Sequence, residues 1–141
     1  MDIRKITPRF FAAPQISVED LPQIAASGIT RVVCNRPDVE VPPSHQAAAI
    51  ETAARAAGLE FCVLPLTHQT MTSDVVAQNY AYLTETDGPV LAYCASGTRS
   101  TIAWALASAK TTPIEELMAA AQSGGYDLSN LRQALEDAAK S

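Results

Sequence analysis

Four short apolar runs, separated by segments with helical signals, constrain the fold of this chain most strongly. The runs are mostly apolar and lack the polar–apolar alternation of a half-exposed strand. Strands of this kind are buried on both faces, which is typical of a parallel sheet between layers of helices. We therefore predict an α/β fold with a central, mostly parallel sheet of about four to five strands flanked by helices. The predicted strands are residues 10–13, 29–34, 59–66 and 90–93.

Helix start and stop signals fill the intervening segments. Serine caps are predicted at Ser17, Ser44 and Ser73, and glycine or proline follows most of the helical segments. The sequence shows no linker, repeat or low-complexity tract, so we predict one domain over residues 1–141. The predicted helices are 17–27, 44–57, 73–86 and 99–109, with one more after Pro113 and a last one capped by Asp127.

The charge and hydropathy patterns exclude several kinds of partner. The net charge of −5 lacks the positive surface charge with which proteins bind nucleic acids. An anion would therefore need a local pocket, because the field of the whole chain repels it. No apolar run approaches the roughly 20 residues of a membrane helix, and the N-terminus lacks the apolar region of a secretory signal. We expect a cytoplasmic protein without nucleic-acid or membrane partners.

Three cysteines occur without the C-x-x-C spacing of a metal or redox motif. Cys34 and Cys62 lie inside apolar runs and are expected to be buried hydrophobic residues. The histidines and cysteines share no metal-ligand spacing, so we predict no metal and no cofactor. The sequence leaves open whether either cysteine can pair with Cys94.

The segment YCASGTRS, residues 93–100, carries the chemistry. In parallel sheets, ligands bind beyond the carboxyl ends of the strands, where loops 35–43, 67–73 and 94–99 are predicted to meet. The backbone N–H groups of a strand-to-helix loop form an anion-binding nest, and Gly97 permits its tight turn. Cys94 at its floor would be a thiolate nucleophile, and Arg99 would supply a bidentate fork. The predicted anion-binding residues are Ala95, Ser96, Gly97, Thr98 and Ser100.

This segment resembles the signature loop of cysteine-dependent phosphatases and rhodaneses. From about Phe10 to Arg132 the chain is similar to a narrower family, the phosphatase-like domain found fused to metallo-β-lactamase-type hydrolases and labelled a sulfur transferase. The segments VVCNRPD (32–38), AGL (57–59) and YCASGTRS carry the resemblance. It implies a tyrosine/dual-specificity-phosphatase-like fold, and a persulfide-oxidising metallo-hydrolase as a partner.

Two departures from the phosphatase pattern favour sulfur transfer. Four residues separate Cys94 from Arg99, as in many rhodaneses, whereas phosphatases of this fold have five. The place of the phosphatase aspartate general acid is taken by His68, and the next carboxylate is Asp74. Arg36 is expected either on the rim of the pocket or in a pair with Asp38 or a cap carbonyl.

The sequence therefore predicts a cysteine-dependent sulfurtransferase with a Cys94 persulfide intermediate and a small anionic sulfur donor. One alternative is a phosphatase-like hydrolase acting on a phosphoester through a phosphocysteine. A second alternative is a non-catalytic module that binds an oxyanion or a persulfide.

Overall fold

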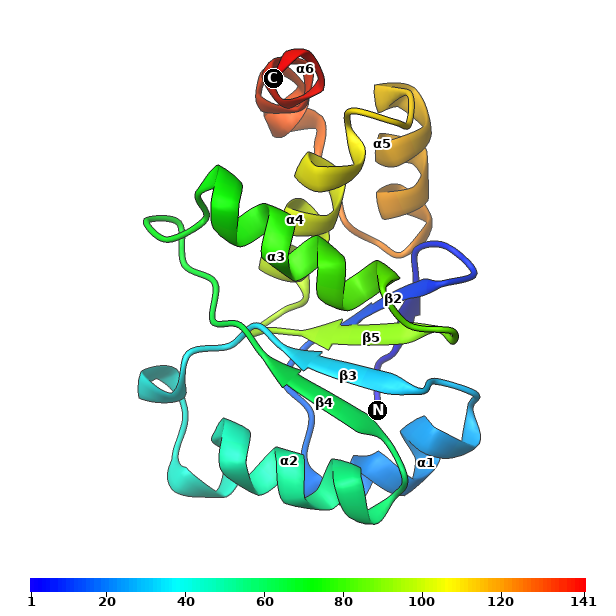
Figure 1. Ribbon diagram of the computed structural model, residues 1–141, viewed down its shortest axis with the longest axis vertical. Coiled ribbons are helices and arrows are strands. Elements are labelled where there is room, and N and C mark those ends of the chain that lie inside the picture. The colour runs from blue at the N-terminus through cyan, green and yellow to red at the C-terminus, as the bar shows by residue number, and fades with distance from the viewer.

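The computed structural model describes residues 1–141 and contains a five-stranded sheet in the order β1-β2-β5-β3-β4 (Figure 1). Strands β2, β5, β3 and β4 are parallel, as the apolar runs predict, and β5 lies at the centre with all four residues buried. The α/β class and the mostly parallel sheet are confirmed. The strands are β1 (Arg4–Lys5), β2 (Phe10–Ala13), β3 (Arg31–Cys34), β4 (Glu60–Val63) and β5 (Val90–Tyr93).

Strand β1 is the one strand that the sequence analysis missed. It pairs antiparallel with β2, with Arg4 opposite Ala12 and Lys5 opposite Phe11. Its two residues are both basic and too few to form an apolar run or an alternating pattern. Its position at the edge of the sheet places the N-terminal segment beside β2.

Helices cover both faces of the sheet (Figure 1). One core packs β-sheet residues such as Phe10 and Ala92 against residues of α3 to α6, and the other packs Val32 and Leu91 against residues of α1 and α2. Both layers follow from strands that are apolar on both faces. The helices are α1 (Leu21–Ala26), α2 (Ala47–Ala56), α3 (Ser73–Thr84), α4 (Thr98–Ser108), α5 (Ile114–Ser123) and α6 (Arg132–Lys140).

Several predicted element boundaries were wrong. The predicted strand 59–66 ends at Val63, two residues before Pro65, which has no N–H to donate to a strand ladder. The predicted helix 17–27 divides into a 3₁₀ turn, Val18–Asp20, and the shorter α1. The predicted helix 73–86 ends at Thr84, and its cap is Thr72, whose hydroxyl accepts from Val75 N–H.

The caps predicted at Ser44 and Asp127 were also wrong. Ser44 lies in a 3₁₀ turn, Pro43–His45, and the first N–H of α2 is instead satisfied by the Asp38 carboxylate, 2.8 Å from Ala47 N. Asp127 accepts from Ser129 N–H in a turn ahead of α6. A side chain distant in sequence thus satisfies the first donor of α2, whereas α6 begins without a side-chain cap.

No helix is long and apolar enough to cross a membrane.

Candidate active site at the carboxyl edge of the sheet

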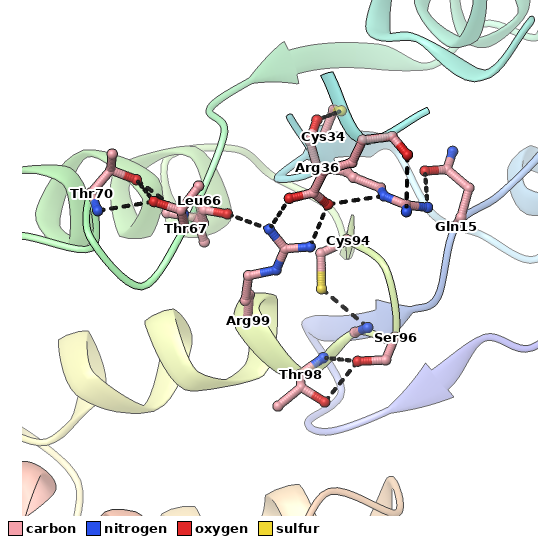
Figure 2. A network of polar contacts seen from close by, with 12 residues as sticks. Gln15, Cys34, Arg36, Leu66, Thr67, Thr70, Cys94, Ser96, Thr98 and Arg99 are labelled. Carbon is pink, nitrogen blue, oxygen red and sulfur yellow. Dashed lines mark hydrogen bonds and ion pairs between the residues drawn. The ribbon is translucent and has the colours of Figure 1, made fainter. Parts of the chain in front are cut away.

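The loop between β5 and α4 holds Cys94 at its floor. Cys94 directly follows β5 and is fully buried, with 0% of its surface exposed. The Gly97 N–H donates to Cys94 Sγ at 3.1 Å (Figure 2). Residues 95–97 turn the chain, and α4 begins at Thr98. The loop therefore directs a backbone donor at the sulfur, which is the arrangement that stabilises a thiolate or a bound anion.

Gly97 makes this turn possible. Its φ is +94°, in the left-handed region, and a Cβ there would overlap the Tyr126 hydroxyl and lie 2.8 Å from Tyr126 Cζ. A glycine is needed at this position both for the backbone angle and for the space. The sequence analysis identified the first of these reasons and could not see the second.

Arg99 is held at one end and free at the other. Its Nη1 donates to Glu40 Oε2 at 3.0 Å and to the Leu66 carbonyl at 2.7 Å, while its Nη2 donates to Glu40 Oε1 at 2.7 Å. Glu40 thus occupies the Nη1–Nη2 edge of the guanidinium. The Nε–H and the second N–H of Nη2 form the opposite edge, which makes no hydrogen bond, and Figure 2 shows that edge turned toward Cys94. A planar guanidinium fixed in this way can offer a second, bidentate fork to an anion beside the sulfur.

Glu40 is a residue of the candidate site that the sequence analysis missed. It lies in a 3₁₀ turn, Asp38–Glu40, and its carboxylate bridges Arg99 and Arg36, with Arg36 Nε 3.2 Å from Glu40 Oε1. Beside two guanidinium groups, Arg99 foremost, the pKa of Glu40 is lowered. Glu40 is therefore a carboxylate at neutral pH, and it acts as an anchor for the arginines.

Arg36 lies near the rim, and its main partner is Glu40 rather than Asp38. It contacts Glu40 and the Gln15 side-chain oxygen, 3.3 Å from Arg36 Nη1, whereas Asp38 caps α2. Of the predicted alternatives, the pairing with Asp38 is absent, whereas Arg36 Nη2 does donate to a carbonyl at the end of the 3₁₀ turn, that of Glu40, at 3.4 Å. Arg36 reaches Arg99 through their shared carboxylate.

The hydroxyls of the predicted anion-binding residues Ser100 and Thr98 bind other side chains. The Ser100 hydroxyl donates to Asn35 Oδ1 at 2.8 Å, and Asn35 Nδ2 donates to Asn79 Oδ1 at 2.8 Å, so Ser100 belongs to a buried polar network. The Thr98 hydroxyl accepts from Ser96 Oγ at 2.9 Å. The structure gives neither hydroxyl a hydrogen bond to Cys94.

His68 and Asp74 do not join the site. Both residues are exposed, and neither side chain hydrogen-bonds to residues 94–99. The turn that contains His68 closes on itself, because the hydroxyl of Thr67 accepts from Thr70 N–H and the hydroxyl of Thr70 accepts from Thr67 N–H. This conformation brings no protonated acid to the loop.

Cys34 and Cys62 are free thiols, and neither is paired with Cys94. Cys34 is buried, as predicted, whereas Cys62 is only half-buried because β4 is an edge strand. Burial raises the pKa of each thiol. No group of three or more His, Cys, Asp or Glu side chains is placed to hold a metal ion.

A surface groove of about 470 Å³ lies between α3, α4 and α6. It contains none of residues 94–99, and its lining is mostly apolar. This groove is therefore separate from the β5–α4 loop that the sequence predicts to bind an anion.

A parallel sheet with a cysteine–arginine loop at the carboxyl end of its central strand defines the cysteine-dependent phosphatase class of fold. Residues 2–111 match the family described as beta-lactamase hydrolase-like protein, phosphatase-like domain, and the chain belongs to this family. The expected phosphatase-like fold and family are confirmed. The likeness to rhodaneses and the fusion to a metallo-hydrolase stay predictions.

Individual relatives agree with this assignment. The chain is 30% identical over 105 residues to a beta-lactamase hydrolase-like protein of Agrobacterium fabrum, covering 74% of this chain and 24% of that protein. It thus spans about a quarter of the length of this relative. A crystal structure of a candidate phosphatase from Neisseria meningitidis matches with a TM-score of 0.86 and 33% identity, covering 98% of this chain and 99% of that one. PTPMT1 matches with a TM-score of 0.75 over 98% and 94% of the two chains, and at 15% identity this shows the fold alone.

Replacing Glu40 by glutamine is expected to destabilise the fold by about 1 kcal/mol at pH 7, since two arginines lose their charged partner and partial exposure screens the loss. The pKa of Glu40 is lower in the folded than in the unfolded chain. Its contribution is therefore present above the unfolded value of about 4.3 and is lost as the pH falls through the folded value. Urea unfolding at pH 7 and at about pH 3 should show a larger difference between wild type and variant at pH 7 than at pH 3.

Glu51→Gln is the matched control for this experiment. Glu51 pairs with Arg55 on the exposed face of α2, with 2.9 Å between Arg55 Nε and Glu51 Oε2. An exposed pair of this kind is worth little, so the control should change stability by a few tenths of a kcal/mol. Equal effects of the two substitutions at pH 7 would show that Glu40 does not anchor the arginines.

Proposed function

We propose that the chain is a cysteine-dependent hydrolase of phosphomonoesters. The observation that carries this proposal is the pair of donors around Cys94: the Gly97 N–H on its sulfur and the unpaired Nε–Nη2 edge of Arg99 turned toward it. A phosphoryl group is a tetrahedral anion, and donors fixed in advance stabilise the charge that develops on its oxygens. Membership of a phosphatase-like family and the fold of the phosphatases support the same reading.

The reaction would proceed in two steps. The Cys94 thiolate attacks phosphorus, an S–P bond forms, and the ester P–O bond breaks as the leaving oxygen departs with its electron pair. Water then attacks phosphorus, the S–P bond breaks, and inorganic phosphate and the thiolate are released. Cys94 is fully covered in this conformation, so the surrounding side chains must open before substrate reaches the sulfur.

The surroundings of the loop favour substrates with good leaving groups. Glu40 is the carboxylate nearest to Arg99, and its lowered pKa makes it a poor proton donor at neutral pH. His68 and Asp74 lie exposed and apart from the loop. General acid catalysis contributes about 10²–10⁴ in rate when a donor is present. We infer that aryl phosphates, whose leaving phenolates need less protonation, are better substrates than alkyl phosphates.

The test is release of inorganic phosphate from p-nitrophenyl phosphate, phosphotyrosine and an alkyl phosphate such as phosphoserine, with Cys94→Ser as the blank. We expect Cys94-dependent release that is faster from both aryl esters. Absence of phosphate release from all three would overturn the proposal. If phosphate binding persisted without turnover, the chain would be the non-catalytic anion-binding module.

Sulfur transfer is the second candidate, and the spacing of the loop favours it. Four residues separate Cys94 from Arg99, and a shorter loop encloses a smaller guest, such as the outer sulfur of a persulfide. Here the thiolate would attack the outer sulfur of thiosulfate, releasing sulfite and leaving a Cys94 persulfide, which cyanide converts to thiocyanate. Cys94-dependent thiocyanate without phosphate release would favour this reaction over hydrolysis.

We also propose a metallo-hydrolase partner, on the basis of the family resemblance and the length of the relatives. The Agrobacterium relative is about four times as long as the segment that it shares with this chain and is named a beta-lactamase hydrolase-like protein. A partner of that class would either share one chain with the phosphatase-like domain or bind it as a separate protein.

A further inference from the structure

Tyr126 reaches the active-site loop from a part of the chain outside the segment that matches the family. The match ends at residue 111, and Tyr126 follows α5. Its ring is 5% exposed, and its hydroxyl donates to the Ser96 carbonyl at 2.9 Å. No other side-chain hydroxyl hydrogen-bonds to a backbone carbonyl of residues 94–96.

The Ser96–Gly97 peptide group links this hydroxyl to the nucleophile. In a trans peptide, the C=O and the N–H point in opposite directions. The Ser96 oxygen receives the Tyr126 hydroxyl, and the Gly97 N–H of the same peptide donates to Cys94 Sγ at 3.1 Å. Fixing the oxygen on the outside of the loop therefore fixes the N–H on the inside.

This peptide needs an external anchor because of the glycine. A glycine adopts positive and negative φ values about equally well, so Gly97 itself does little to keep the peptide in one orientation. A rotated peptide would turn the Ser96 oxygen toward the sulfur, and a carbonyl oxygen would repel a thiolate or a bound anion. The Tyr126 hydroxyl opposes this rotation by binding the oxygen from outside.

Tyr126 is itself held in place by the N-terminal strand. The Arg4 guanidinium lies over the Tyr126 ring, 5.2 Å from its centroid, and Arg4 Nη1 donates to the Gly124 carbonyl at 3.2 Å. Tyr126 N–H also donates to the Ala121 carbonyl at 2.9 Å. The tyrosine is therefore a fixed donor and not a mobile side chain that meets the loop by chance.

We propose that Tyr126 is a positioning residue of the active-site loop, which acts through the Ser96–Gly97 peptide to keep the Gly97 N–H directed at Cys94. The inference rests on the proposed function only in taking this loop as the reactive site.

The test is the Tyr126→Phe variant, which keeps the ring over Arg4 and removes only the hydroxyl. The pH profile of Cys94 alkylation by iodoacetamide is read by peptide mass spectrometry, which separates Cys94 from Cys34 and Cys62. We expect the midpoint for Cys94 to move to higher pH by about half a unit to one unit, the loss of one hydrogen bond to the thiolate. We also expect kcat/KM for p-nitrophenyl phosphate to fall about fivefold to tenfold.

A shift of this kind would come from the peptide and not from a change of charge. The titratable groups around Cys94 are Arg99 on α4, Cys34 at the end of β3 and Tyr126, with Glu40 and Arg36 beyond Arg99. Burial raises the pKa of Tyr126, so its hydroxyl is neutral across the assay range and its removal deletes no charge. A merely structural loss would lower the melting temperature without moving the alkylation midpoint.

Tyr82→Phe is the control, since the Tyr82 hydroxyl accepts from Gln78 on α3 and is remote from the loop. An unmoved Cys94 midpoint in folded Tyr126→Phe would overturn the proposal, whether or not phosphatase activity is found. If that variant does not fold, amide NMR of the wild type decides. The Gly97 amide resonance should follow the Cys94 titration and be protected from exchange, and an exposed, unresponsive Gly97 amide would also overturn it.

Discussion

Cys94→Ser is expected to lower phosphate release at least about a thousandfold while leaving the loop intact. The serine hydroxyl is a far weaker nucleophile at neutral pH than a thiolate, because it stays protonated. Its oxygen can still accept the Gly97 N–H, which lies 3.1 Å from the sulfur in the wild type, so the nest should persist. The measurement pairs steady-state phosphate release with binding of inorganic phosphate by calorimetry. Activity should disappear while phosphate binding remains.

Cys62→Ser is the matched control for this prediction. Cys62 is a half-buried thiol on the edge strand β4, outside the loop, and the same sulfur-to-oxygen change there should leave kcat/KM within about twofold. Full activity in Cys94→Ser would remove both the phosphocysteine and the persulfide mechanism. Loss of phosphate binding together with activity would show instead that the substitution had collapsed the loop.

The parts of the fold predicted from the sequence are those with local signals. The run of apolar residues at 90–93 predicted the central strand because a strand buried on both faces has no polar position. The cysteine, glycine and arginine that follow it predicted the loop because its chemistry lies within six consecutive residues. Strand β1 was missed because two basic residues give no pattern, and its pairing partner is supplied only by the folded sheet.

The parts of the site that were missed depend on contacts between distant segments. Glu40 lies 59 residues before Arg99, and Tyr126 lies 30 residues after Ser96. A lone glutamate between two valines and a lone tyrosine after two glycines carry no periodicity or spacing that would identify a partner. The sequence thus pointed to the residues to which the proposed chemistry is assigned and not to those that hold them, since holding a planar guanidinium or a peptide group is a property of three-dimensional geometry.

The anchoring residues also explain how an acidic chain can present an anion site. The net charge of −5 gives no long-range attraction for a phosphoester, and Glu40 adds a negative charge beside Arg99. Attraction must therefore come from donors at contact distance. Arg99 supplies its free edge, and the loop supplies backbone N–H groups whose direction is fixed by hydrogen bonds.

Gly97→Ala is expected to lower kcat/KM by about a hundredfold or more, because the loop cannot keep its shape with a side chain at this position. An alanine at a φ of +94° is strained by about 1–2 kcal/mol, and its Cβ would overlap the Tyr126 hydroxyl and lie 3.2 Å from the Ala13 carbonyl oxygen. The backbone would relieve the overlap by moving the Ser96–Gly97 peptide, the one that donates to Cys94.

Gly28→Ala separates the two contributions to this effect. Gly28 has a φ of +99°, almost the same as that of Gly97, but a Cβ there would have nothing within 4 Å, and the residue follows α1 on the other face of the sheet. Both variants should therefore share the strain of about 1–2 kcal/mol in urea unfolding, whereas only Gly97→Ala should also lose activity per folded molecule. Equal activity in the two variants would mean that the loop accommodates the methyl group, and the orientation of the Gly97 N–H would then be unnecessary for turnover. Loss of activity confined to Gly97→Ala would assign the effect to the overlap with Tyr126 and Ala13, since the backbone strain is common to both.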